Sequence, residues 1–177
     1  MQSLVGSQCD WSRISEFKPI FRPPHKLGQV ELDFVEAQCS KLEKLGFIRR
    51  SPQSQYASAT VVVRKKDEEG NYTDFRQCGD YRPLNQETPL DRYPLPGIED
   101  IFNQMGGGTI FSKLDLQSGY HQMPLRQEDR AKTAFWGFNR IMWEWLVVPF
   151  GLKNPPPYFQ RRMDHILRDI PFLQMLH

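Results

Sequence analysis

The chain is short of cysteine and of long apolar runs, and both shortages exclude classes of protein. Its three cysteines, Cys9, Cys39 and Cys78, are odd in number and far apart, and no two form a Cys-x-x-Cys pair. This usage predicts reduced thiols rather than a disulfide framework or a zinc site. No window approaches the roughly 18 consecutive apolar residues of a membrane span, and the first residues lack the basic start and apolar run of a signal peptide. We therefore expect an intracellular protein, cytoplasmic or nuclear, that is not secreted and has no membrane partner.

A strong net charge is also lacking, because 23 Lys and Arg residues nearly balance 21 Asp and Glu residues, for a net charge of +2. Such a balance does not by itself indicate a nucleic-acid partner. Basic residues do cluster in the first half and near the end: Arg49, Arg50, Arg64, Lys65, Lys66, Arg76, Arg82, Arg161, Arg162 and Arg168. On charge pattern alone, these clusters are typical of solvated faces. With 177 residues, 39% of them hydrophobic, the chain can bury the core of one domain, or of one domain and a part.

The first part of the chain carries a helical pattern followed by a hairpin pattern. Apolar residues recur at helical spacing from Gln29 to Leu45, and Gly46 follows as a stop signal, which predicts an amphipathic helix. Residues 59–65 and 72–80 are expected to be strands on either side of a turn at 67–71. Both arms of this hairpin carry basic residues.

The rest of the chain mixes helices and strands without regular alternation. Residues 98–105 are expected to form a short helix closed by three glycines, and residues 109–114 a buried strand that ends at Asp115. Further strands are expected at 121–125, 133–136 and 140–147. The last element should be a helix whose apolar face carries Phe159, Met163, Ile166, Leu167 and Ile170. This mixture indicates an α+β fold rather than a wound parallel sheet.

Several ordered motifs give the chain a resemblance to a known family. The motifs are IRRSPQSQYASATVVVRKKD, DFRQCGDYRPLN, DRYPLPGIEDIF, FSKLDLQSGYHQ, KTAFWGFNRIMWEWLVVPFGLKN and YFQRRMD. Their order and spacing, from Pro19 to Phe172, resemble the reverse transcriptases of gypsy-type LTR retrotransposons and their plant and viral relatives. The resemblance implies the right-hand polymerase fold, with fingers at roughly 19–95 and an incomplete palm at roughly 96–177. Residues 1–18 would be an N-terminal extension, which we expect to be poorly ordered.

The resemblance also implies a chemistry, the template-directed addition of deoxynucleotides to a 3′-hydroxyl. Such phosphoryl transfer relies on two divalent ions that stabilise the attacking and leaving oxygens. Asp115 matches the family's first metal-binding aspartate, and the main-chain carbonyl of Leu116 would lie beside the same Mg²⁺ ion and the nucleotide. An isolated Leu-Asp-Leu would favour an aspartate that caps the turn after a strand. The matching residues around it favour the catalytic and metal-binding role.

The same resemblance implies contacts to an incoming deoxynucleotide. Tyr120 aligns with the aromatic ring that lies under the sugar and excludes a ribose 2′-hydroxyl. Lys65 and Arg76 match hairpin cations that hold the triphosphate in relatives, since cations can neutralise charge that develops there. Phe150 and Gly151 match the turn that borders the nucleotide pocket. The alternatives for these residues are a core aromatic and solvated surface cations.

Contacts to an RNA or DNA template–primer are implied in the same way. Arg82 and Asn85, in the motif DYRPLN, correspond to residues that contact the template strand. In the family, a helix like the last one is followed by a Tyr-x-Asp-Asp hairpin, and this sequence has no adjacent pair of aspartates. Asp129, Asp164 and Asp169 are not expected to substitute, because they belong to other elements.

We therefore expect a truncated fragment that binds Mg²⁺ poorly and is catalytically incompetent alone. Three alternatives stay open. The chain could be a weak nucleic-acid-binding module, an enzyme completed by another chain that supplies the missing part of the palm, or a non-functional remnant of a transposable element.

Two departures from the family pattern suggest drift without strong selection. Pro155 stands where relatives commonly carry alanine, which gives three consecutive prolines at the start of the last helix. Gly79 stands in a strand where a branched apolar residue is usual, and glycine weakens a strand by about 0.5–1 kcal/mol. With an unpaired palm sheet edge in addition, we expect a marginally stable fragment.

Overall fold

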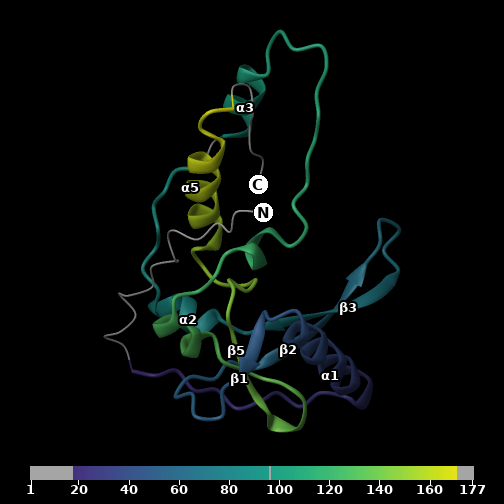
Figure 1. Cartoon of the computed structure of the whole chain (residues 1–177). Coiled ribbons are helices and arrows are strands. Elements are labelled where there is room, and N and C mark those ends of the chain that lie inside the picture. Colours follow the sequence, from purple (N-terminus) through teal and green to yellow (C-terminus); the bar gives the residue numbers. More distant parts are fainter. Residues whose placement is uncertain (1–17, 96, 171–177) are drawn as a thin grey trace.

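A computed structural model describes residues 18–95 and 97–170 of the chain. A lower body carries the first helix, the strands and the second helix, and the last helix rises from it toward a third helix at the far end (Figure 1). The helices are α1 (Gln29–Lys44), α2 (Arg82–Glu87), α3 (Ile98–Gln104), α4 (Gln127–Arg130) and α5 (Pro155–Leu167). The strands are β1 (Ile48–Arg50), β2 (Thr60–Lys66), β3 (Tyr72–Gly79), β4 (Phe135–Trp136) and β5 (Met142–Trp145). This mixture confirms the α+β expectation.

The helix expected at 29–45 is confirmed as α1, one residue shorter. Its buried face carries Val35, Cys39 and Leu42, and Gly46 ends it with a φ of +71°, a left-handed conformation that favours glycine. At the other end, the backbone N–H of Gly28 donates to the carboxylate of Glu31 at 2.8 Å. The helix packs on the three-stranded antiparallel sheet of order β1-β5-β4. This contact forms the first core cluster, which consists of Val35, Cys39, Leu42, Ile48, Phe135 and Trp143.

The expected hairpin is confirmed as β2 and β3. Its antiparallel register pairs Thr60 with Gly79 and Val63 with Arg76. Burial decreases along β2 from Thr60 toward Lys66, so the hairpin is anchored at its base and exposed at its tip.

A second core cluster joins the base of this hairpin to α2 and to the start of α5. Its buried members are Tyr81, Leu84, Met123, Leu125, Val148, Leu152 and Tyr158. The Asn154 side chain and the Arg161 guanidinium hold α5 in place. Asn154 donates to the carbonyl of Pro89 at 2.8 Å, and Arg161 contacts both carboxylate oxygens of Asp91. These bonds connect α5 to the segment that follows α2.

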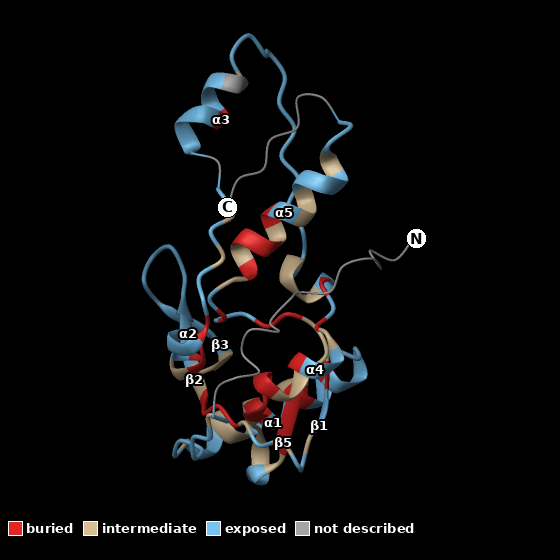
Figure 2. Cartoon of the chain, turned by 90° about the vertical axis from the view of Figure 1, so that its left-hand side faces the viewer, coloured by how far each residue is buried: buried red, intermediate tan, exposed pale blue. Residues whose placement is uncertain are grey.

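The expectation of a buried strand at 109–114 is wrong. This segment is extended coil that stands away from the body, and Figure 2 shows it exposed along its length. Ile110 is 89% exposed and Leu114 is 85% exposed. A strand needs a neighbour for its backbone groups, and no described residue forms a backbone hydrogen bond with residues 109–116.

Three further strand expectations need correction. Residues 121–125 form a 3₁₀ turn at Gly119–Gln122 and then a single bridge from Pro124 to Val147. The strands expected at 133–136 and 140–147 shrink to β4 and β5, because 3₁₀ turns occupy residues 131–133 and 138–140. Local β-propensity overestimated these strands, since tertiary contacts decide where such short strands end.

Both departures from the family pattern fit the structure. Pro155, Pro156 and Pro157 are the first three residues of α5, where the missing N–H groups would have no partner within the helix. Gly79 faces the ring of Tyr81, and a Cβ atom built at position 79 would lie 2.6 Å from that ring. Close packing against Tyr81 therefore favours glycine at position 79, and the first turn of α5 accommodates the prolines.

Candidate nucleotide and template site

Of the residues expected around the nucleotide, Tyr120 and Phe150 meet beside the second core cluster, whereas Lys65 and Arg76 lie on the hairpin. The ring of Tyr120 lies 5.4 Å from that of Phe150 and 5.5 Å from that of Phe159 on α5. Tyr120 is half-buried, and this burial raises the pKa of its hydroxyl. Its ring is thus both packed and partly accessible, so the steric role and the core role are compatible.

A tight turn follows Phe150. Gly151 has a φ of +92°, and its carbonyl accepts a hydrogen bond of 2.8 Å from the side-chain amide of Asn85. The Lys153 ammonium contacts the carbonyls of Asn85 and Thr88 at 3.2 and 2.9 Å. The structure therefore joins a residue expected to contact the template, Asn85, to the turn expected to border the nucleotide. The Asn85 side chain supports that turn in this conformation.

Asp115 and Leu116 lie on the exposed coil before the 3₁₀ turn, not at the end of a buried strand. Within residues 18–95 and 97–170, no group of three or more His, Cys, Asp or Glu side chains could hold a metal ion. Mg²⁺ favours octahedral coordination, commonly with one or two carboxylates plus water and substrate phosphate. In the part that the structure describes, Asp115 is therefore a single possible ligand and not a formed metal centre.

The alternative aspartates are engaged elsewhere. Asp129 is buried and contacts the Lys132 ammonium at 2.6 Å. Asp164 accepts hydrogen bonds of 2.7 Å from the Tyr93 hydroxyl and from the Gln160 amide, and its carboxylate raises the pKa of Tyr93. Asp169, just beyond α5, is exposed. Asp129 and Asp164 therefore stabilise other parts of the fold.

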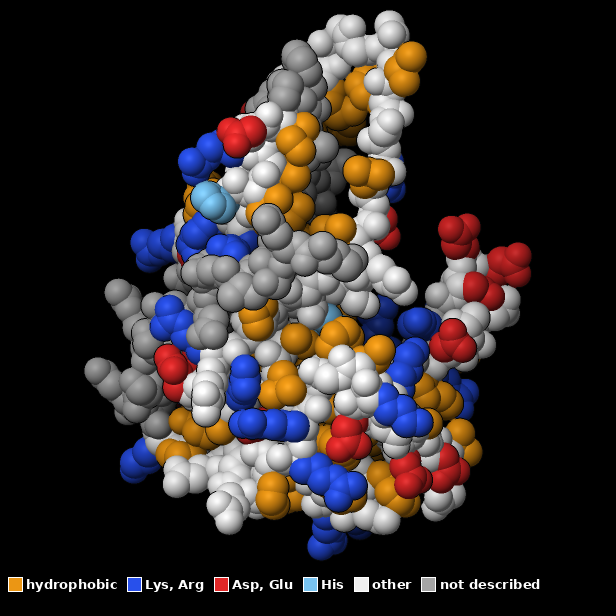
Figure 3. Space-filling view, in the orientation of Figure 1, with side chains coloured by type: hydrophobic (Ala, Val, Ile, Leu, Met, Phe, Trp, Pro, Cys, Tyr) orange, Lys and Arg blue, Asp and Glu red, His pale blue; other side chains and the backbone are white. Residues whose placement is uncertain are grey.

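The cations of the hairpin lie on two faces. Arg76 pairs with Val63, whereas the neighbouring Arg64 lies over the rings of Tyr72 and Phe75 on the other face. Lys65 is two residues from Val63, beside a register shift, and strand alternation places it on the face of Arg76. Figure 3 shows Lys and Arg side chains near the base of the hairpin and acidic side chains at its tip. The turn Asp67–Gly70 is therefore the acidic end, and the cations lie on the strands.

Arg82, the other residue expected to contact the template, is bound to a carboxylate. Its Nε and Nη2 atoms donate to the two Asp80 oxygens at 2.8 and 2.7 Å, and this bidentate contact lowers the pKa of Asp80. The Arg82 side chain is still 82% exposed. Sequence reasoning missed Asp80, although an aspartate two residues before an arginine is a signal for such a pair.

His121 is a second residue that sequence reasoning missed. Its ring lies 5.3 Å from Phe47, 5.2 Å from Trp145 and 5.1 Å from Phe150. Burial lowers its pKa, and its Nε2 atom is buried without a hydrogen-bond partner among the described residues. Burial therefore favours the neutral imidazole, and its ring packs against the ring of Phe150.

Two of the three cysteines, Cys39 and Cys78, lie in the part of the chain that the structure describes. Cys39 is a buried free thiol whose pKa is raised to about 11, chiefly by burial, and Cys78 is also free. Cys9 lies outside the described residues, as do nearly all of the extension at 1–18 and the last residues, 171–177. No helix in the described part of the chain is long and apolar enough to cross a membrane.

Comparison with known proteins identifies the family of this chain. Residues 63–176 match the family described as "Reverse transcriptase (RNA-dependent DNA polymerase)". The chain belongs to the reverse transcriptase family. The chain is 45% identical over 159 residues to the Pol polyprotein of transposon gypsy from Drosophila melanogaster, and the match covers 89% of the chain and 15% of that protein. It is 39% identical over 152 residues to the Pol polyprotein of transposon 297 from the same organism, covering 86% and 14%.

These relatives place the chain among the reverse transcriptase domains of gypsy-type LTR retrotransposons, and the chain spans only about a seventh of their length. Among solved structures, it resembles a foamy viral protease–reverse transcriptase in complex with an RNA/DNA hybrid. The TM-score is 0.73 at 20% identity, over 90% of this chain and 21% of that one. This likeness shows the fold, the right-hand polymerase fold with fingers and part of a palm.

Proposed function

We propose that this reverse transcriptase domain binds template–primer and deoxynucleotide as part of an RNA-directed DNA polymerase. The observation that carries the proposal is the family match over residues 63–176, a range that contains Lys65, Arg76, Tyr120 and Phe150. A structural relative was solved with an RNA/DNA hybrid and another with double-stranded DNA, which supports a nucleic-acid partner. We place the protein inside the cell, in the cytoplasm or nucleus.

We further propose that the 177-residue polypeptide alone does not polymerise. Reverse transcriptases use divalent metal ions, and a two-metal mechanism needs several carboxylates to hold both ions. The sequence has no adjacent pair of aspartates, and Asp129 and Asp164 are engaged elsewhere. Asp115 and the carbonyl of Leu116 can supply ligands for only part of such a centre.

Nucleotide binding by the hairpin is tested with a fluorescent deoxynucleoside triphosphate and a bound template–primer. We expect the double variant Lys65→Ala, Arg76→Ala to weaken triphosphate binding roughly 10-fold or more, because it removes two charge-assisted hydrogen bonds to the phosphates. Lys66→Ala is the matched control, since Lys66 lies in the same hairpin over the ring of Tyr72. Equal affinity in the double variant and the control would refute the assignment.

A second candidate function is an enzyme completed by another chain, and one observation favours it. The segment 109–116 presents apolar side chains, and its backbone groups form no backbone hydrogen bond with a described residue, so it can accept a strand from a partner.

We expect a separate polypeptide with the region that follows the matched part of the gypsy Pol relative to bind this segment. Primer extension by the mixture, but by neither chain alone, would support completion, and Asp115→Asn should abolish it. If the mixture neither associates nor extends a primer, this candidate fails.

A further inference from the structure

A lysine from a distant part of the chain binds the carbonyls at the C-terminal end of α2. In an α-helix the carbonyl of Asn85 would accept from the N–H of residue 89, but residue 89 is a proline and has no N–H. The Lys153 ammonium donates to this carbonyl at 3.2 Å and to the carbonyl of Thr88 at 2.9 Å. A cation there also suits the partial negative charge of the helix end. Lys153 therefore completes α2.

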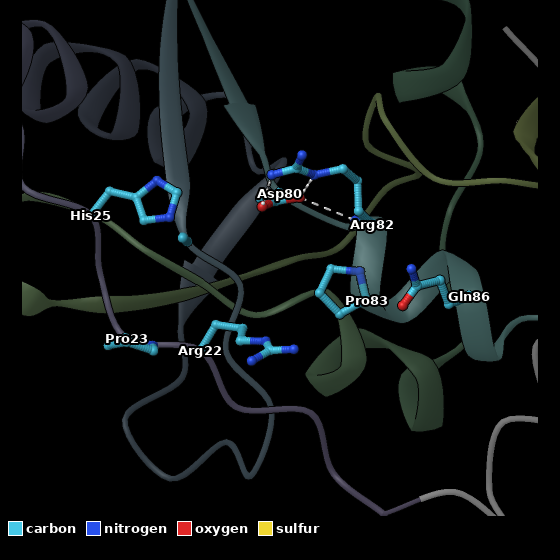
Figure 4. A pocket seen from close by; sticks show the side chains of 8 residues that line it. Arg22, Pro23, His25, Asp80, Arg82, Pro83 and Gln86 are labelled. Carbon is cyan, nitrogen blue, oxygen red and sulfur yellow. Dashed lines mark hydrogen bonds and ion pairs between the residues drawn. The ribbon is translucent and has the colours of Figure 1, made fainter.

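The start of α2 is held as well. Arg82, the first residue of the helix, forms the bidentate contact with Asp80, and an open pocket of about 420 Å³ lies beside this pair (Figure 4). The pocket is lined by Arg22, Pro23, His25, Ala59, Asp80, Arg82, Pro83 and Gln86. With a carboxylate at one end and an ammonium at the other, this helix of 6 residues is fixed at both ends.

The same lysine lies two residues after Gly151, in the turn expected to border the nucleotide. That turn is already joined to α2, because the side-chain amide of Asn85 donates to the carbonyl of Gly151 at 2.8 Å. Leu152, between the two, is buried in the second core cluster. Residues 151–153 and Asn85 thus form a closed ring of contacts, which uses both the side chain and the carbonyl of Asn85. A displacement of Asn85 is therefore transmitted to the turn.

The residue after Lys153 extends this connection. The Asn154 side chain donates to the carbonyl of Pro89 at 2.8 Å and accepts from the N–H of Asp91 at 3.1 Å. The segment that leaves α2 and the segment that leaves the turn are therefore bonded to each other at successive positions. Hydrogen-bond networks of this kind can carry coupling between two sites.

We propose that Lys153 is a positioning residue that couples the template side of the site, at Asn85, to the nucleotide side, at Phe150. The proposal rests on the proposed function and assigns a role to a residue that the resemblance does not include. Nucleic acid bound against α2 restrains Asn85, and Lys153 transmits that restraint to the turn, so Phe150 is in place when the deoxynucleotide arrives. Two ligands coupled in this way each raise the affinity for the other by the same factor.

The test measures this factor as the affinity of a labelled template–primer with and without a saturating, complementary deoxynucleoside triphosphate. The primer ends in a dideoxynucleotide, so it cannot be extended. We expect the triphosphate to tighten template–primer binding by the wild type, and Lys153→Met to reduce this tightening about 3- to 10-fold, because methionine has no donor for the two carbonyls. Since Lys153 is exposed, its loss should change the affinity without triphosphate by less than about 2-fold.

Three further variants separate coupling from a merely structural role. Lys153→Arg keeps a cation that can donate to both carbonyls, so the tightening should be retained. Lys153→Gln keeps a shorter, neutral donor and should lose part of the tightening, and it replaces Lys153→Met if urea unfolding shows that the latter does not fold. Lys44→Met is the matched control, because Lys44 is an exposed lysine in the last turn of α1 and its removal changes the charge equally.

The outcomes separate this proposal from the proposed function. If the triphosphate tightens binding equally in the wild type and Lys153→Met, or if Lys44→Met loses as much tightening, the proposal is overturned and the function stands. If the wild type binds template–primer but the triphosphate leaves its affinity unchanged, no coupling exists, and the proposal is overturned while nucleic-acid binding stands. If no template–primer binds, both the proposal and the proposed function fail.

Discussion

The ring of Tyr81 occupies the space that a side chain at position 79 would need. Tyr81 is 1% exposed, and its hydroxyl donates to the carbonyl of Thr133 at 3.0 Å, so the ring has little room to move. We expect Gly79→Ala to lower the free energy of unfolding by about 1–3 kcal/mol, as overpacking does. Urea unfolding of the purified chain measures this change.

Gly28→Ala is the control for that substitution. A Cβ atom at position 28 would meet only the Glu31 carboxylate at 3.7 Å, which is ordinary contact. Because alanine is a poorer helix N-cap than glycine, we expect Gly28→Ala to lower the free energy of unfolding by less than about 1 kcal/mol. Equal effects at positions 28 and 79 would contradict the packing explanation for Gly79.

His121 makes the stability of the fold depend on pH. Its folded-state pKa is lowered from 6.5 by burial, so the unfolded chain takes up a proton at a higher pH than the folded chain. The stabilisation is fully present above the unfolded value and declines as the pH falls through and below it. We expect the urea midpoint to fall from about pH 7 toward pH 5, and His121→Phe to reduce this fall. Parallel pH profiles for the variant and the wild type would contradict the prediction.

At the scale of elements, the main question is whether the segment 109–116 is a core strand or an exposed coil. Its apolar side chains face solvent, whereas Leu125, in the second core cluster, is fully buried. We expect Ile110→Ser to change the free energy of unfolding by less than about 0.5 kcal/mol, and Leu125→Ala to lower it by about 2–5 kcal/mol. Both are measured by urea unfolding. A large destabilisation in Ile110→Ser would indicate that the segment is a core strand after all.

The elements that could be predicted from sequence are those with a local signal. The helix at 29–44 follows from its apolar spacing and from Gly46, and the β2–β3 hairpin from two β-rich runs around a turn. The segment 109–114 has a strand composition, but pairing depends on a neighbour that its own sequence does not contain. The ends of β4 and β5 depend on 3₁₀ turns that local β-propensity does not reveal.

The site residues Lys65, Arg76, Tyr120 and Phe150 stay predictions from the motifs, and the structure adds contacts that the motifs do not contain. The motifs did not reveal that Asn85 bonds to Gly151 or that His121 supports Phe150. Those contacts join residues 29 or more positions apart, and only the fold brings them together.

At the scale of the whole molecule, the chain presents two surfaces with different chemistry. The fingers carry cations on the hairpin strands and around the pocket at Arg22, while the far part exposes an apolar segment beside a single carboxylate, Asp115. The first surface suits a polyanion, and the second suits a polypeptide. The proposed function therefore predicts binding without catalysis for this polypeptide alone.

One measurement tests this account most directly. A labelled primer–template is incubated with the 177-residue chain, Mg²⁺ and all four deoxynucleotides, and bound and extended primer are measured in the same sample. The account predicts bound primer, with affinity that falls as salt rises, and no extension. Extension that Asp115→Asn abolishes, or no binding at low salt, would contradict it.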